Sequence, residues 1–213
     1  MKDFFRRYLA LPEQSDADAS PSAFFSRLPV LETKSLLLRP IRRQDAKDIF
    51  AYSSDSEVCR YVLWEPHRSL SESREYIRYV RQLYHQGAPS SWAIALKEDG
   101  PVIGTIGFMW YSQENQSAEV GYSLSRQYWN HGYATEALSA VVRSAFSQLP
   151  LYRIEAQHDL RNPASGRVME KCGFYREGVM RGRLINKGEH IDVALYAILK
   201  SDLAIESIRG FGV

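Results

Sequence analysis

The stretch from Glu119 to Ala137 carries the residues of an anion-binding turn. The pattern up to Leu124 predicts a strand, and the small residues after Gly132 predict a helix that packs closely on a sheet. The first N–H groups of such a helix have no acceptor inside it and, with the helix dipole, form a phosphate site. Gly132 would let the backbone approach a ligand without a Cβ clash. A plain strand-to-helix turn stays open as the alternative, since the stretch is neither a dinucleotide-binding glycine motif nor a P-loop.

The stretch 162–174 predicts a second helix with a polar start. Asn162 is a good cap, and the proline after it is tolerated in the first helical position. Gly173 predicts where the helix ends. Ser165 falls in the first turn, where its hydroxyl either contacts a ligand or satisfies its own backbone.

The two stretches resemble the acetyl-CoA-binding motifs of the GNAT superfamily of N-acetyltransferases. The superfamily signature Arg/Gln-x-x-Gly-x-Gly/Ala has its counterpart in Trp129-x-x-Gly132-x-Ala134. The second stretch is similar to the Asn-x-x-Ser-x-x-x-x-Glu-Lys-x-Gly-Phe segment of the branch typified by ribosomal-protein alanine N-acetyltransferases. The resemblance covers residues 31–202 and speaks to fold and cosubstrate more than to the acyl acceptor.

The resemblance implies an α/β fold: a single acyl-CoA N-acyltransferase domain whose mixed sheet is splayed at its centre and flanked by helices. Acetyl-CoA is the implied cosubstrate, with no metal. Its pantetheine arm is expected where the strand 119–124 splays from the strand 153–157, and Gly121 is expected to mark a bulge there. The residues expected to bind acetyl-CoA are Tyr122, Leu124, Trp129, Asn130, His131, Gly132, Tyr133, Ala134, Thr135, Asn162, Ser165, Arg167 and Lys171. For the last two, a solvated face is the alternative.

Two residues are expected to be catalytic. Glu119 is the candidate general base for the attacking amine, with a structural ion pair as the alternative and Glu155 in reserve. Ser165 is expected to hydrogen-bond the CoA sulfur, because Met169 stands where many superfamily members carry a tyrosine acid. No cysteine has the setting of a nucleophile, so we expect direct transfer in a ternary complex.

The acceptor site is expected beside the irregular stretch 61–67, lined by Trp64, Glu65 and His67. Tyr111 and the turn 186–190 are expected to close its other side. A terminal α-amine has a pKa of about 7.7–8.0, against about 10.4 for lysine, so a weak base suffices for it. The resemblance favours a protein or peptide N-terminus. A small amine or antibiotic, or an acetyl-CoA sensor without turnover, stays open.

The elements that must position these residues alternate in type. Strands are predicted at 36–41, 92–96, 102–109, 118–124, 153–157, 174–184 and 190–199, and helices at 44–53, 69–85, 132–147 and 163–172. Ser69 and Glu72 predict a capping box at the second helix. This order predicts a mixed sheet with helices on its faces.

The composition fits one globular domain: 213 residues, 45% hydrophobic and 24% charged, with a net charge of +2. Balanced charge and the lack of a long apolar run give no argument for a nucleic-acid or membrane partner. Two cysteines are too few for a disulfide scaffold, which favours a cytoplasmic protein with buried thiols, and five scattered histidines argue against zinc.

We expect an N-terminal extension and linker at 1–30, the catalytic domain at 31–202 and a tail at 203–213. Arg39, Arg42 and Arg43 are expected to form a solvated face. The sequence leaves the oligomeric state, monomer or homodimer, open.

Overall fold

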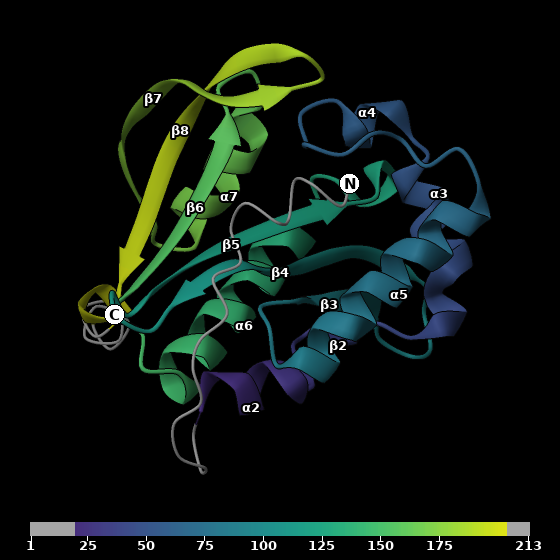
Figure 1. The fold of residues 1–213 in the computed structure, drawn as a ribbon, viewed down its shortest axis with the longest axis horizontal. Coiled ribbons are helices and arrows are strands. Elements are labelled where there is room, and N and C mark those ends of the chain that lie inside the picture. Colours follow the sequence, from purple (N-terminus) through teal and green to yellow (C-terminus); the bar gives the residue numbers. More distant parts are fainter. Residues whose placement is uncertain (1–19, 204–213) are drawn as a thin grey trace.

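The computed structural model describes residues 20–203, whose strands form one mixed sheet of eight in the order β1-β2-β3-β4-β5-β6-β8-β7 (Figure 1). The strands are β1 (Leu31–Glu32), β2 (Leu36–Pro40), β3 (Ser91–Leu96), β4 (Val102–Ser112), β5 (Ser117–Leu124), β6 (Arg153–Asp159), β7 (Tyr175–Asn186) and β8 (Glu189–Leu199). The helices are α2 (Pro21–Ser26), α3 (Ala46–Ser53), α4 (Ser56–Cys59), α5 (Leu70–Gln86), α6 (Tyr133–Gln148) and α7 (Pro163–Lys171), with short 3-10 turns η1 (Arg43–Asp45) and η2 (Arg126–Tyr128). The predicted α/β fold is confirmed.

The sheet is splayed between its two central strands. β5 and β6 run parallel, and they pair only over residues 117–119 and 153–155. Beyond that point β5 stays paired with β4 as far as Leu124, while β6 stays paired with β8 as far as Asp159. Figure 1 shows β6 turning away from β5. The predicted splay is therefore present, and it leaves one edge of each strand open toward the gap.

The bulge lies on β4 and not at Gly121. Gly121 pairs regularly with Gly107, whereas Phe108 faces Val120 and the register then shifts by one residue at Met109. The bulge was expected on β5 at Gly121 and is found on β4 instead, although it does lie where the splay begins.

Different helices cover the two faces of the sheet, and the alternation along β3 shows how. Trp92 and Ile94 join the core formed with α2, α6 and α7. Ala93 and Ala95 point to the other face, into a smaller core formed with α3 and α5. Successive strand residues point to opposite faces of the sheet. Because both faces of β3 are covered, its sequence is a continuous apolar run and not an alternation of apolar and polar residues.

The packed unit begins before residue 31. Ser20 caps α2, and Phe24 and Phe25 are buried against Trp92 and Phe108 in the main core. The stretch 20–30, which belongs to the predicted extension, is thus packed on the domain core. The rest of the predicted extension (1–19) and most of the predicted tail (204–213) lie outside the described residues.

Two local predictions were wrong. Arg39 is not solvated: it is 8% exposed and forms a buried bidentate ion pair with Asp45. The capping box at α5 does not form, because the Ser69 side chain makes no capping bond and Glu72 accepts the N–H of Arg68 at 2.9 Å instead.

Both cysteines are buried thiols outside any disulfide, as predicted. Burial raises the pKa of the Cys59 thiol to about 12. Among the described helices, none has the length and apolar character needed to cross a membrane.

Candidate active site

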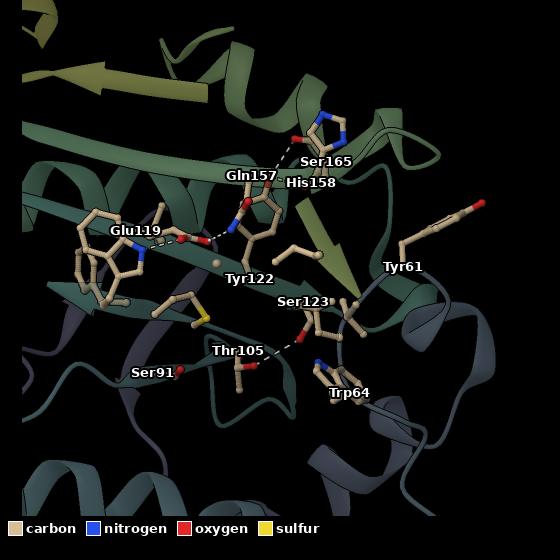
Figure 2. Close-up of a pocket in the computed structure, with 18 of the residues that line it drawn as sticks. Tyr61, Trp64, Ser91, Thr105, Glu119, Tyr122, Ser123, Gln157, His158 and Ser165 are labelled. Atoms are coloured by element: carbon tan, nitrogen blue, oxygen red, sulfur yellow. Dashed lines mark hydrogen bonds between the residues drawn. The ribbon is translucent and has the colours of Figure 1, made fainter. Parts of the chain in front are cut away.

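A cavity of about 440 Å³ opens at the splay (Figure 2). Its walls come from β4, β5, β6, the start of α7, one side of α5, the stretch 61–65 and the β7–β8 hairpin. The tip of that hairpin contacts the opposite wall, because the Lys187 ammonium donates to the carbonyls of Cys59 at 2.7 Å and Val62 at 3.1 Å. The turn 186–190, expected to close the acceptor site, thus contacts the stretch 59–62, while Leu184, Ile191 and Val193 of the same hairpin line the cavity.

Glu119 lines this cavity at the last paired position before β5 and β6 separate. The indole N–H of Trp110 donates to its Oε2 at 2.6 Å, and the amide of Gln157 donates to its Oε1 at 2.9 Å. Burial raises the pKa of this carboxyl, and the hydrogen bonds from Gln157 and Trp110 oppose that shift. Its hydrogen-bond partners are neutral, so the carboxylate is held in place without a cationic partner, as a general base requires.

Ser165 lies across the gap, in the first turn of α7. The Tyr122 hydroxyl, from β5, donates to the Ser165 carbonyl at 2.9 Å and lies 3.0 Å from its Oγ. Asn162 precedes the helix and also lines the cavity, yet its side chain makes no capping bond. The amide of Asn162 is therefore not committed to capping, which was the alternative role.

The anion-binding turn has the expected backbone. Asn130 and Gly132 adopt left-handed conformations, with φ of 63° and 84°. The N–H of Glu136 donates to the carbonyl of Gly132, so the N–H groups of Tyr133, Ala134 and Thr135 precede the first hydrogen bond of the α6 helix. These donors lie at the positive end of the helix dipole and fit a pyrophosphate.

Side chains hold this turn in position. The indole N–H of Trp129 donates to the Leu124 carbonyl at 2.8 Å, which ties the turn to the end of β5. His131 stacks on Tyr133, with ring centroids 5.7 Å apart. The Glu136 carboxylate accepts a hydrogen bond from the Ser35 N–H at 2.6 Å. This bond links the first turn of α6 to the stretch before β2.

Replacing Trp129 by phenylalanine should weaken acetyl-CoA binding with little change in kcat. Phenylalanine keeps an aromatic ring but removes the bond to Leu124, and one such bond contributes about 1 kcal/mol, or about fivefold in affinity. Calorimetric titration with CoA measures the change.

Trp92→Phe is the matched control. It removes an indole-to-carbonyl bond of the same 2.8 Å length, from the buried Trp92 to Pro29, and should lower Tm without changing CoA affinity. Equal CoA affinities in wild type and Trp129→Phe would show that the bond does not position the turn.

The other residues expected at the site divide into two groups. Trp64 and Glu65 line the cavity, while Arg167 and Lys171 are exposed on α7. Glu155, the reserve base, is instead bonded to Arg153 at 2.7 Å and does not line the cavity.

Two residues expected at the acceptor site lie elsewhere. His67 is buried behind Trp64, where its Nδ1 lies 2.8 Å from the hydroxyls of both Ser53 and Ser73, and burial lowers its pKa. Tyr111 packs edge-on against Phe25 beneath the sheet. Both are structural in this fold because their side chains are used in packing.

Sequence reasoning missed two partners of the candidate base. Gln157 follows Glu155 by two residues, so strand alternation alone could have placed its side chain on the face of Glu119. Trp110 could not have been found this way. The bulge at Met109 reverses the alternation of β4, and nothing in the sequence marks that bulge. His158 also lines the cavity, where its ring packs against Tyr196.

An anion-binding helix start, a splayed parallel strand pair and a carboxylate at the splay together define an acyltransferase that uses acyl-CoA. Residues 35–175 match the acetyltransferase (GNAT) domain family. The chain is also 39% identical over 172 residues to an uncharacterized N-acetyltransferase, YoaA, of Bacillus subtilis, covering 81% of this chain and 97% of that one. The protein belongs to the GNAT acetyltransferase family and is an acetyl-CoA-dependent N-acetyltransferase.

More distant relatives differ in their acceptors. Escherichia coli K12 proteins named ribosomal protein uS5-alanine N-acetyltransferase and spermidine N(1)-acetyltransferase are each 24% identical, over 81% and 73% of this chain and 91% and 81% of their own.

Solved structures support the same fold. A GNAT-family acetyltransferase from Bacillus anthracis superposes with a TM-score of 0.73 at 28% identity, covering 81% of this chain and 99% of the other. A ribosomal L7/L12 alpha-N-protein acetyltransferase in complex with coenzyme A superposes with a TM-score of 0.72 at 20% identity, covering 80% and 98%.

Proposed function

We propose that this enzyme acetylates a protein or peptide N-terminal α-amine by direct attack on acetyl-CoA in a ternary complex. The observation that carries the proposal is Glu119, held by two neutral donors in a cavity at the splay. No cysteine is among the residues that line this cavity, so no thiol is placed to carry the acetyl group. Attack by the amine itself is then the simplest route.

Each end of the site has a separate task. The first N–H groups of α6 bind the pyrophosphate, and the open edges of β5 and β6, with the Asn162 amide, bind the pantetheine arm. A backbone N–H near Gly121 or Tyr122 polarises the thioester carbonyl. Glu119 takes the proton that the amine loses on forming the N–C bond. Ser165 donates a hydrogen bond to the sulfur as the C–S bond breaks.

The acceptor part of the cavity favours an amine with apolar neighbours. Four carboxylates line the cavity, those of Glu65, Glu72, Glu119 and Asp159, and the last is paired with Arg161; no lysine or arginine is among the lining residues. Such a wall attracts a cationic amine and repels an acidic one. Aromatic rings of Trp64 and Tyr76 contribute apolar wall, which suits the apolar side chain of a peptide's first residue. Two buried thiols outside any disulfide support a reducing, cytoplasmic setting.

The acceptor is tested by CoA release from acetyl-CoA with a panel of amines. The α-amines of peptides with N-terminal Ala, Ser or Met should be acetylated at least about tenfold faster than lysine side chains. A larger fraction of an α-amine than of a lysine side-chain amine is neutral near pH 7.5. The matched control is the same peptide with its N-terminus blocked and an internal lysine left free, which should release no CoA. Mass spectrometry of the product locates the acetyl group.

Other results would assign the site differently. Turnover only with spermidine or an aminoglycoside would replace the α-amine acceptor by a small amine. If no amine of the panel releases CoA while acetyl-CoA still binds in calorimetry, the result would favour an acetyl-CoA sensor without turnover.

A further inference from the structure

We propose that Tyr122 is a positioning residue that turns the Ser165 hydroxyl toward the leaving sulfur of CoA. Ser165 makes the contact with sulfur, and Tyr122 acts only through Ser165. The inference rests on the proposed function, since it deepens the role of Ser165 at that site.

The Tyr122 phenol lies against the first turn of α7, which carries the cavity-lining hydroxyl of Ser165. Tyr122 lies on β5 beyond the last pair with β6, and its side chain crosses the gap to Ser165 (Figure 2). Farther along α7, the buried Met169 fills the corresponding position with a thioether. Of the residues that line the cavity from α7, Ser165 is therefore the one with a proton to donate.

Two acceptors on one residue compete for the single Tyr122 proton. Its hydroxyl donates to the Ser165 carbonyl at 2.9 Å, and the Ser165 Oγ lies 3.0 Å away. When the tyrosine donates to the carbonyl, the serine hydroxyl can donate back to the phenol oxygen. When the tyrosine donates to the Oγ, the serine proton is left free for the sulfur.

Negative charge developing on sulfur selects the second arrangement. As the amine nitrogen bonds to the acetyl carbon and the C–S bond breaks, the electron pair goes to sulfur and Ser165 turns its proton toward it. Tyr122 then donates to the Oγ, and the two bonds strengthen each other. Burial raises the pKa of Tyr122, so the phenol keeps its proton throughout and orients the serine without being an acid itself.

The competing role is a purely structural one, in which Tyr122 anchors the first turn of α7 through the Ser165 carbonyl. Tyr196 provides the matched control, because its hydroxyl anchors α7 at the other end by donating to Glu170 at 3.0 Å. Tyr122→Phe and Tyr196→Phe each remove one hydroxyl that bonds to α7, and only the first removes a contact with the Ser165 Oγ.

The first test is a double-mutant cycle with Tyr122→Phe and Ser165→Ala, using acetyl-CoA and the best peptide of the panel. Tyr122→Phe should lower kcat about tenfold and leave the KM for acetyl-CoA within about twofold. In the Ser165→Ala background the same change should have no further effect on kcat. Tyr196→Phe should lower Tm and leave kcat unchanged. Additive losses in the cycle, or equal losses of kcat in the two tyrosine variants, would overturn the proposal.

A second readout needs no acceptor and so separates this inference from the proposed function. CoA and desulfo-CoA are titrated by calorimetry above the pKa of the CoA thiol. Wild type should prefer CoA, and Tyr122→Phe and Ser165→Ala should each lose most of that preference, while Tyr196→Phe keeps it. Equal affinity of wild type for the two ligands would overturn the contact between Ser165 and sulfur, and with it the role of Tyr122.

Discussion

Replacing Glu119 by glutamine should lower kcat by about 10²- to 10³-fold while leaving CoA affinity unchanged. General bases contribute about 10²- to 10⁴-fold, and an α-amine that is partly neutral needs the lower part of that range. Glutamine has nearly the same shape and can still bond to Trp110, so the variant removes proton acceptance more than packing. Steady-state CoA release gives kcat, and calorimetry gives the affinity.

The pH dependence of kcat/KM tests the same role of Glu119. A general base works deprotonated, so wild-type kcat/KM should fall as pH falls through the pKa of Glu119. Burial raises that pKa, and the acidic limb should therefore lie above the range of an ordinary glutamate. In Glu119→Gln this limb should vanish and leave only the ionisation of the acceptor amine, which moves when the acceptor is changed.

Glu155→Gln is the matched control, because Glu155 pairs with Glu119 in register and yet lies outside the cavity. Its carboxylate is bonded to Arg153, so the variant should keep wild-type kcat and the acidic limb. If Glu119→Gln kept that limb, another group would be the base.

Sequence patterns predicted the backbone of the anion-binding turn far better than the surroundings of Glu119, for a physical reason. The anion-binding turn is local: Gly132, the strand before it and the helix after it lie in one stretch, and their pattern predicts the geometry. The surroundings of Glu119 are not local. Gln157 comes from another strand, and Trp110 reaches the carboxylate only because of the bulge at Met109.

The same distinction explains the errors in the fold. Phe24 and Phe25 follow a polar stretch that predicts a linker, and only the main core, assembled from distant strands, gives them a place to pack. Arg39 is similar, since its charge predicts exposure and its partner Asp45 sits six residues away, beyond the end of β2. Burial of a charge depends on a partner, and the sequence alone did not identify that partner.

Breaking the Arg39–Asp45 pair should cause the largest loss of stability. Arg39→Met leaves Asp45, which is 3% exposed, without its cationic partner. Removing one member of a buried pair costs about 3–5 kcal/mol, because the other charge stays desolvated. In a chain of this size that lowers Tm by about 6–20 °C, measured by thermal unfolding followed by circular dichroism. Below the lowered Tm, kcat should stay close to wild type, since neither residue lines the cavity.

Two further variants decide whether burial is the cause. Lys97→Met removes the cation of an exposed pair with Glu32, whose length of 2.9 Å is similar, and Tm should hardly change because water screens exposed charges. Arg39→Met combined with Asp45→Leu should recover much of the loss, because no buried charge remains. Recovery should be incomplete, since Asp45 also accepts the Arg42 N–H at 2.7 Å where η1 begins. A double variant less stable than Arg39→Met would mean that this backbone contact, and not the ion pair, is the main contribution of Asp45.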